Sequence, residues 1–91
     1  MPRSLGTPGK QRGPLVKDVN SIGQLVRHRR LTLALRIDDA ARTCGVAVNV
    51  LSRLENGGTV GADRLLRVLS GLGLAMLVVT KEDALQVTPF S

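Results

Sequence analysis

Four side chains near the middle of the sequence are of the types that do chemistry. Asp38 and Asp39 are adjacent carboxylates, Cys44 is the single thiol of the chain, and His28 is its single imidazole. Paired carboxylates suggest acid–base catalysis or a bound metal, but no His or Glu motif accompanies them. The alternative is that both lie in the first turn of a helix, where the helix dipole favours negative charge. We favour this second interpretation, so the sequence predicts no enzyme, no catalytic residue, and no metal or other cofactor.

Positive charge is the strongest feature of the composition. Thirteen Lys and Arg residues oppose seven Asp and Glu residues, giving a net charge of +6, and ten of the thirteen are Arg. Such an excess attracts polyanions, with nucleic acid first and anionic membranes second, although a basic protein without such a partner is the alternative. The guanidinium group of Arg also binds phosphate oxygens bidentately. Because Phe90 is the only aromatic residue, stacking of single-stranded bases is not expected.

The length and the cysteine count limit the remaining possibilities. The 91 residues are enough for one domain, and one cysteine excludes an internal disulfide. No apolar run reaches membrane-spanning length, and the N-terminus lacks the apolar stretch of a signal peptide. We therefore expect a soluble, cytoplasmic, nucleoid-associated protein without membrane contact.

The spacing of apolar residues predicts three helices that would position these side chains. The first spans about 21–32 and begins at a capping residue, Ser21 or Asn20. The second spans 37–44, and the third spans 62–73 before glycines end it. The side chains expected to face the core are Ile22, Leu25, Val26, Ile37, Ala40, Ala41, Cys44, Leu65, Leu66, Leu69 and Leu72.

Residues 45–57, GVAVNVLSRLENG, fit two interpretations at first sight. The alternating valines are typical of a strand, but a strand would place Leu51, Arg53 and Glu55 on one face. That set suits neither a core nor solvent. A helix instead separates two groups: Val46, Val50, Leu51 and Leu54 on one side, and Val48, Asn49, Ser52 and Arg53 on the other. We therefore predict a helix.

The segment 74–80, LAMLVVT, is apolar, contains paired valines and follows glycines, which predicts a strand. A lone strand leaves its backbone N–H and C=O groups unpaired, and a second copy paired antiparallel would satisfy them. The sequence thus predicts a homodimer, with a tail packed on its own helices as the alternative. The pairing residues would be Leu74, Ala75, Met76, Leu77, Val78 and Val79.

The ends of the chain differ from this folded part. Residues 1–19 combine Pro, Gly and basic residues and predict a flexible arm, which either reaches along DNA or is a solvated tail. Residues 20–73 form the expected helical domain. Residues 81–91 are expected to be a flexible polar tail, in which Phe90 is either incidental or an anchor for a partner.

Residues 22–57 resemble the lambda-repressor-like, XRE-type helix-turn-helix family. The agreeing residues are Ile22, Gly23, Val26, Arg27, Arg30, Leu35, Asp39, Ala41, Gly45, Val46, Leu51, Ser52, Glu55 and Gly57. The last helix and LGLAMLVV are similar to the HipB-like antitoxin branch, which pairs with a HipA-like kinase toxin. The resemblance implies a mainly α, four- to five-helix lambda-repressor-like domain, with one C-terminal strand pairing across a homodimer.

The resemblance also implies roles for particular residues. The helix from about 47 to 56 would be the recognition helix in the major groove, with Val48, Asn49 and Arg53 facing base edges. The chemistry agrees, because Asn pairs with adenine, Arg pairs with guanine, and Val contacts the methyl group of thymine. Phosphate contacts are implied for Arg27, Arg36, Ser52 and Asn56, and a structural ion pair is implied between Arg30 and Glu55.

Three residues depart from the family pattern. Ile37 replaces a glutamine that hydrogen-bonds phosphate, which Ile cannot do. Arg36 replaces the usual capping threonine of the second helix, and Ala47 replaces the usual Ser or Thr cap of the recognition helix. These departures weaken the expected affinity for DNA and leave the expected fold unchanged.

Two functions follow from these expectations. The first is a dimeric, sequence-specific transcriptional repressor that binds a palindromic operator in double-stranded DNA, as the autoregulating antitoxin of a HipBA-like toxin–antitoxin pair. The second is a protein-interaction module that neutralises a toxin and has lost specific DNA binding. The departures at Arg36, Ile37 and Ala47 motivate the second.

Overall fold

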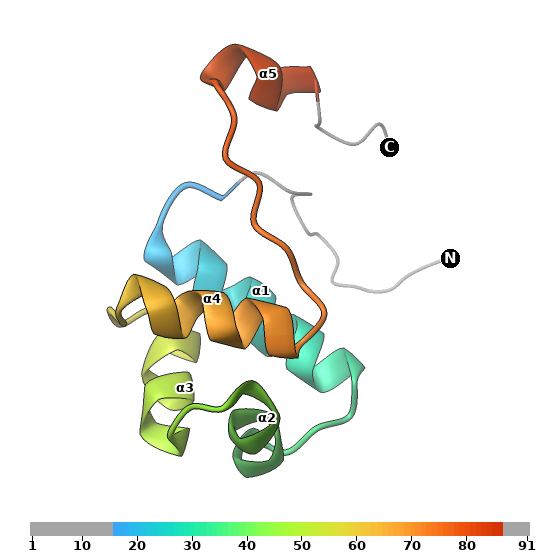
Figure 1. Ribbon diagram of the computed structural model, residues 1–91, viewed down its shortest axis with the longest axis vertical. Helices are drawn as coiled ribbons and strands as arrows, with labels where there is room; N and C mark the ends of the chain where they lie inside the picture. The colour runs from blue at the N-terminus through green and yellow to red at the C-terminus, as the bar shows by residue number, and fades with distance from the viewer. Residues whose placement is uncertain (1–15, 87–91) are drawn as a thin grey trace.

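A computed structural model describes residues 16–86, which contain five α-helices and no strand. In Figure 1, the first four helices gather into one body, and the chain after α4 leads away from that body to α5. The mainly helical fold expected from the sequence is confirmed. The helices are α1 (Val19–Thr32), α2 (Ile37–Cys44), α3 (Val48–Glu55), α4 (Ala62–Gly71) and α5 (Lys81–Gln86).

One hydrophobic core joins the first four helices. Helix α1 packs on α3, while α2 packs on α4 and on α3. Each large apolar side chain that leaves water contributes about 1.5–3 kcal/mol, so this cluster supplies the main stabilisation of the body. Its buried members are Val26, Ala40, Ala41, Cys44, Leu51, Leu54, Val68, Leu69 and Leu72.

Two glycines allow the helices to approach closely. A Cβ atom on Gly23 of α1 would collide with the backbone carbonyl of Leu54 in α3. A Cβ atom on Gly71 of α4 would lie 2.7 Å from the Sγ atom of Cys44 in α2. Each glycine therefore fixes one helix pair, with α1 against α3 and α2 against α4.

The first four helices end in the same way. In each, a residue with positive φ follows the helix, and the next amide donates to a carbonyl five residues earlier, as in a Schellman motif. Three of the four residues are glycines, whereas Ala34, after α1, has a φ of 59°. This backbone conformation costs a residue with a Cβ about 1–2 kcal/mol. The four residues are Ala34, Gly45, Gly57 and Gly73.

The start of α1 differs from the expectation. The helix begins at Val19, and its cap is Asp18 rather than Ser21 or Asn20. The Asp18 carboxylate accepts hydrogen bonds from the backbone N–H and the hydroxyl of Ser21, both at 2.8 Å. The backbone hydrogen bond from Ser21 is the main reason why the pKa of Asp18 is lowered. The basic arm predicted for 1–19 therefore overlaps the cap and the first helical residue.

The inward face of α4 also needs a correction. Leu66 was expected in the core, but it is 50% exposed, and Val68 is fully buried instead. Residues three and four apart share a helix face, so Leu65, Val68, Leu69 and Leu72 form the inner stripe and Leu66 lies beside it. The helix ends at Gly71, two residues earlier than predicted.

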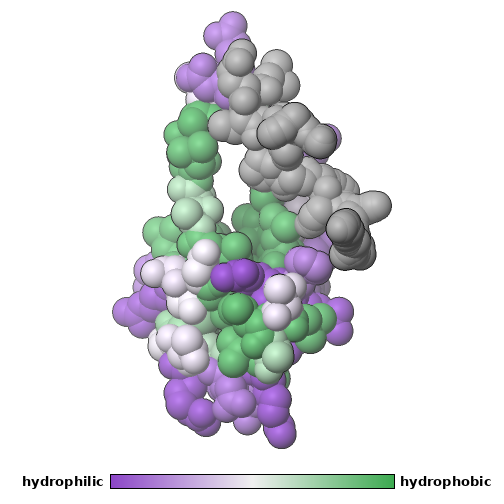
Figure 2. Space-filling view, turned by 90° about the vertical axis from the view of Figure 1, so that its right-hand side faces the viewer, coloured by the Kyte–Doolittle hydropathy of each residue, from purple (hydrophilic) through white to green (hydrophobic). Residues whose placement is uncertain are grey.

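No strand forms at 74–80 within the described part of the chain, which corrects the expectation for a single copy. Leu74 packs against the core, but Met76, Leu77, Val78 and Val79 are exposed. Figure 2 shows a hydrophobic column that rises from the body toward a hydrophilic tip. A strand requires a neighbour for its backbone groups, and in the single chain the described residues supply none.

Part of the predicted C-terminal tail is helical, so the expectation of a tail over 81–91 is wrong for its first six residues. Helix α5 begins after Thr80, whose hydroxyl accepts a hydrogen bond from the backbone N–H of Asp83 at 3.1 Å. Glu82 and Asp83 lie in its first turn, where the helix dipole favours acids. Residues 87–91, including Phe90, and residues 1–15 of the predicted arm lie outside the described residues.

Candidate functional site

Helix α3 has two faces of opposite character. Leu51 and Leu54 are buried in the core, while Val48 is 44% exposed and Asn49 and Arg53 are also exposed. These residues follow the separation that the helical interpretation of 45–57 predicted, whereas Val50, expected on the inner side, and Ser52, expected on the outer side, are both half-buried. The outward face offers an apolar contact, an amide and a guanidinium within two helical turns.

The N-terminus of α3 is available to an anion. Ala47 occupies the cap position and makes no side-chain hydrogen bond, and the first turn contains no acidic residue. The first N–H groups of any helix lack partners inside the helix and carry partial positive charge. A phosphate group would satisfy them, so the absence of a capping side chain at Ala47 is compatible with contact to a nucleic-acid backbone.

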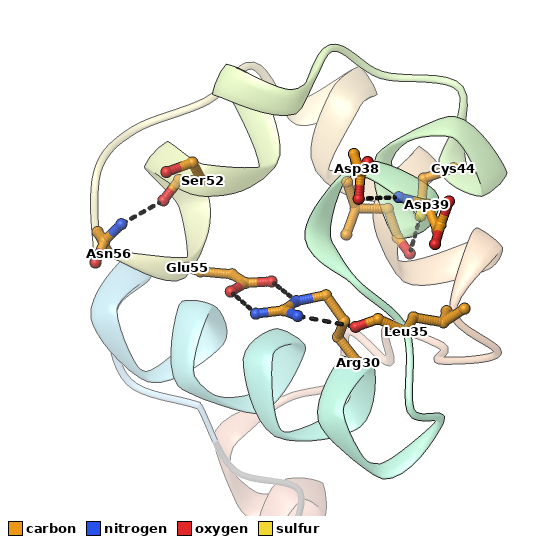
Figure 3. Close-up of polar contacts among 9 residues, drawn as sticks. Arg30, Leu35, Asp38, Asp39, Cys44, Ser52, Glu55 and Asn56 are labelled. Carbon is orange, nitrogen blue, oxygen red and sulfur yellow. Dashed lines mark hydrogen bonds and ion pairs between the residues drawn. The ribbon is translucent and has the colours of Figure 1, made fainter.

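A buried ion pair holds the other end of α3 (Figure 3). Arg30 of α1 donates from Nε to Oε2 of Glu55 at 2.6 Å and from Nη2 to Oε1 at 2.9 Å. Its Nη1 donates to the carbonyl oxygen of Leu35 at 2.9 Å. The hydrogen bond to Glu55 raises the pKa of Arg30, so the guanidinium remains charged. The pair that the resemblance implied is present, and it fixes the angle of α3 on α1.

An open groove lies beside the outward face of α3. Its polar lining comes from Asn49 and Arg53 of α3, from Thr59 in the loop, and from Arg64 in the first turn of α4. Among residues 16–86, Arg53 has no carboxylate partner, and the nearest carboxylate contact of Arg64 is to Asp63 at 3.8 Å. Two guanidinium groups thus face one groove with little neutralisation.

Thr59 and Arg64 were not expected to join the site. No sequence pattern indicated that the loop after α3 folds the start of α4 back beside Arg53. The glycines of that loop were its one local signal, and they mark a turn without giving its direction.

The residues predicted to contact phosphate lie in different situations. Arg27 is exposed on α1, and the Nε atom of Arg36 lies 3.5 Å from Asp38. Ser52 is half-buried, and the side-chain amide of Asn56 donates to the carbonyl oxygen of Ser52 at 2.8 Å, as Figure 3 shows. Asn56 is therefore engaged within its own helix. In the part of the chain that is described, no polar contact joins Arg27 or Arg36 to the groove.

The four side chains whose types could do chemistry do not form a site. Asp38 accepts a hydrogen bond from the N–H of Asp39 at 3.0 Å, and both lie in the first turn of α2. Cys44 is buried, its thiol lies 3.5 Å from the carbonyl oxygen of Val68, and burial raises its pKa. His28 is exposed on α1. Among the described residues, no three His, Cys, Asp or Glu side chains gather as metal ligands.

No family model matches the chain, and no curated protein matches it. Within residues 16–86, no helix combines the length and the hydrophobicity needed to cross a bilayer. The feature that distinguishes the molecule is the exposed face of α3 with the two arginines beside it.

Proposed function

We propose that this protein is a sequence-specific DNA-binding repressor of the lambda-repressor-like type, with α3 as the helix that enters the major groove. The observation that carries the proposal is the arrangement of α3. Its outward face presents Val48, Asn49 and Arg53, while the buried Arg30–Glu55 pair holds its far end on α1. A helix of this kind is exposed enough to reach base edges and fixed enough to read them.

The chemistry of the three side chains supports this role. Asn hydrogen-bonds adenine, Arg hydrogen-bonds guanine, and Val contacts the methyl group of thymine; each good bidentate pair contributes about 1–3 kcal/mol of discrimination. Arg64 and Thr59 extend the polar surface along the groove, where a phosphate group would neutralise the guanidinium of Arg64. The net charge of +6 favours the same polyanionic partner.

We also propose that two copies act together. Residues 76–79 are exposed and apolar, and their backbone has no strand partner within the described residues. Antiparallel pairing of two such segments would satisfy both backbones and cover the apolar side chains. The two-fold axis would place two α3 helices on a palindromic operator with half-sites roughly 34–36 Å apart.

The resemblance to HipB-like regulators adds a physiological role. In that proposal the protein represses its own operon and binds a HipA-like kinase toxin. Co-expression with a kinase-like gene next to its own should give a stable complex and should relieve growth inhibition by that kinase. If the protein does not relieve growth inhibition by the kinase, the antitoxin role is refuted. The proposal of DNA binding is not affected by that result.

Footprinting on the DNA upstream of its own gene tests the proposed function. We expect a protected palindrome, and we expect Arg53→Ala to weaken operator binding by about 1–3 kcal/mol with little change on random DNA. Arg42→Ala is the matched control, because Arg42 is exposed on α2 and pairs with Asp39. Protection without symmetry, or equal losses for Arg53→Ala on operator and random DNA, would contradict the proposal.

A protein-interaction module is the second candidate, and three observations favour it. Helix α2 has no side-chain cap, Arg36 lies near an acid, and Asn56 is engaged internally, so several phosphate contacts of the family pattern are weakened. This candidate predicts a stable protein complex without any footprint at low salt. A footprint in the absence of a partner would exclude it.

A further inference from the structure

Two adjacent arginines of α1 hold two different parts of the body. Arg30 holds the end of α3 through Glu55. Arg29 holds the end of α4, because its Nε donates to the carbonyl oxygen of Leu72 at 2.8 Å in a partly buried contact. The last turn of α1 therefore connects the proposed DNA-reading helix with the point where residues 74–80 leave the body.

The end of α4 is built around this contact. The N–H of Leu74 donates to the carbonyl oxygen of Leu69 at 2.7 Å, and the Leu74 side chain packs against the core. Gly73 has a φ of 77°, and a Cβ atom there would lie only 3.0 Å from an Nη atom of Arg29. Gly73 thus reverses the chain and leaves room for the guanidinium.

The contacts that hold the backbone end at Leu74. Up to Leu74 the backbone is tied to α4 and to Arg29, whereas Met76, Leu77, Val78 and Val79 are exposed. The direction in which the exposed segment starts is consequently set by the contacts around Leu72 and Leu74. Loss of the hydrogen bond from Arg29 to the Leu72 carbonyl would remove one of these constraints. The segment 76–79 could then change direction by rotation of the backbone at Gly73.

We infer that Arg29 is a positioning residue, which fixes the direction of the dimer segment (residues 76–79) relative to α3 and thereby sets the half-site spacing that the dimer accepts. This inference rests on the proposed function. Arg29 itself contacts the α4 end rather than the groove beside α3. Its role is geometric: one helix turn of α1 ties the reading helix to the point where the dimer segment leaves the body.

Spacing preference is the property that a merely structural role would not change. Purified full-length protein would be titrated with duplexes carrying two identical half-sites whose separation varies one base pair at a time, together with a duplex carrying a single half-site. For the wild-type protein we expect one preferred separation. For Arg29→Met, which keeps an unbranched apolar stem and removes the guanidinium donors, we expect the preference to fall by about tenfold, corresponding to one charge-assisted hydrogen bond.

Two variants separate geometry from charge. Arg29→Lys keeps the charge and the N–H donors of one nitrogen atom, so it should restore part of the spacing preference. Arg27→Met removes a neighbouring charge from the exposed face of α1, so it should lower affinity equally at all separations. An unchanged spacing profile for Arg29→Met, or the same broadening in Arg27→Met, would overturn the inference.

A second measurement keeps the two proposals distinguishable. Spin labels attached at position 49 across the dimer, on a Cys44→Ala background, report the separation of the two α3 helices without DNA. Arg29→Met should broaden that distance distribution, while Arg27→Met should not. Wild-type protein that dimerises with a narrow distribution but binds no duplex would refute the proposed function and leave the positioning role standing. An equally broad distribution in wild type and Arg29→Met would refute the positioning role.

Discussion

Two of the helix contacts in the body, α1 with α3 and α2 with α4, solve the same packing problem with different chemistry. Helix α1 meets α3 over Gly23, and a buried Arg30–Glu55 pair lies at the same contact. Helix α2 meets α4 over Gly71, and the buried side chains there are small or apolar, with Cys44 among them. An apolar contact tolerates small shifts, whereas a bidentate ion pair accepts few geometries. The helix proposed to read DNA is the one held by the directional contact.

Breaking the ion pair should have the largest effect. Glu55→Ala leaves a charged Arg30 buried without its partner, so we expect a loss of about 3–5 kcal/mol in the free energy of unfolding. Chemical denaturation followed by circular dichroism measures it. The double variant Arg30→Met/Glu55→Leu is the control, because an apolar pair of similar volume should recover most of that loss. A loss below about 1 kcal/mol for Glu55→Ala would mean that the pair contributes no more to stability than an exposed ion pair does, which would contradict this prediction.

The two close approaches should respond differently to a methyl group. In Gly23→Ala the new Cβ atom meets the backbone of Leu54, which cannot move without moving α3, and we expect a loss of about 1–3 kcal/mol. In Gly71→Ala the nearest atoms are the Sγ atom of Cys44, at 2.7 Å, and its Cα atom, at 2.8 Å. Cys44→Ala should therefore rescue part of the loss in Gly71→Ala and none of the loss in Gly23→Ala. Equal rescue in both would show that the two contacts are not independent.

The strained end of α1 offers a stabilising change. Ala34 has a φ of 59° in a position that three glycines occupy elsewhere in the body. We expect Ala34→Gly to raise the free energy of unfolding by about 1 kcal/mol, because glycine adopts this conformation without the cost of a Cβ. Gly73→Ala is the matched reverse change at the end of α4 and should lower stability. A neutral or destabilising Ala34→Gly would mean that unfolded-chain entropy outweighs the strain.

The smallest expected effect on stability is the pH dependence of the Asp18 cap at the start of α1. The hydrogen bond from the Ser21 backbone N–H lowers the pKa of Asp18 below its ordinary value of 3.8, so the charged form favours the folded state. The resulting stabilisation is present above the unfolded pKa and is lost as the pH falls through the lower, folded pKa. Hydrogen exchange at Ser21 should accelerate on acidification relative to amides in the middle of α1. Asp18→Asn should remove this pH dependence, and its persistence in that variant would assign the effect to another carboxylate.

The local parts of this fold could be predicted from the sequence, while the longer-range parts could not. Apolar spacing located α2 and α3 within a residue or two, because a wrong register would expose Leu51 and Leu54. The core assignment failed at Leu66, because residues 65, 68, 69 and 72 have the three- and four-residue spacing of one helix face and Leu66 lies beside that face. Apolar spacing also missed α5, although Thr80 followed three residues later by Asp83 has capping-box spacing.

The candidate site shows the same division. The outward set Val48, Asn49 and Arg53 followed from the helical period alone. Arg64 joins them only because the loop after α3 turns the start of α4 toward the groove, a fact of tertiary structure. The contact of Arg29 with Leu72 spans 43 residues of sequence, so no local pattern could indicate it.

The most direct measurement of the central claim is the ratio of affinities for the operator and for a scrambled duplex, read by fluorescence anisotropy at physiological salt. For the wild-type protein we expect a ratio of about 10³ or more, as for specific DNA-binding proteins. The triple variant Val48→Ala/Asn49→Ala/Arg53→Ala should keep its helical content and its dimerisation, and its ratio should fall close to one. A triple variant that retains the wild-type ratio would contradict the claim that the exposed face of α3 reads DNA sequence.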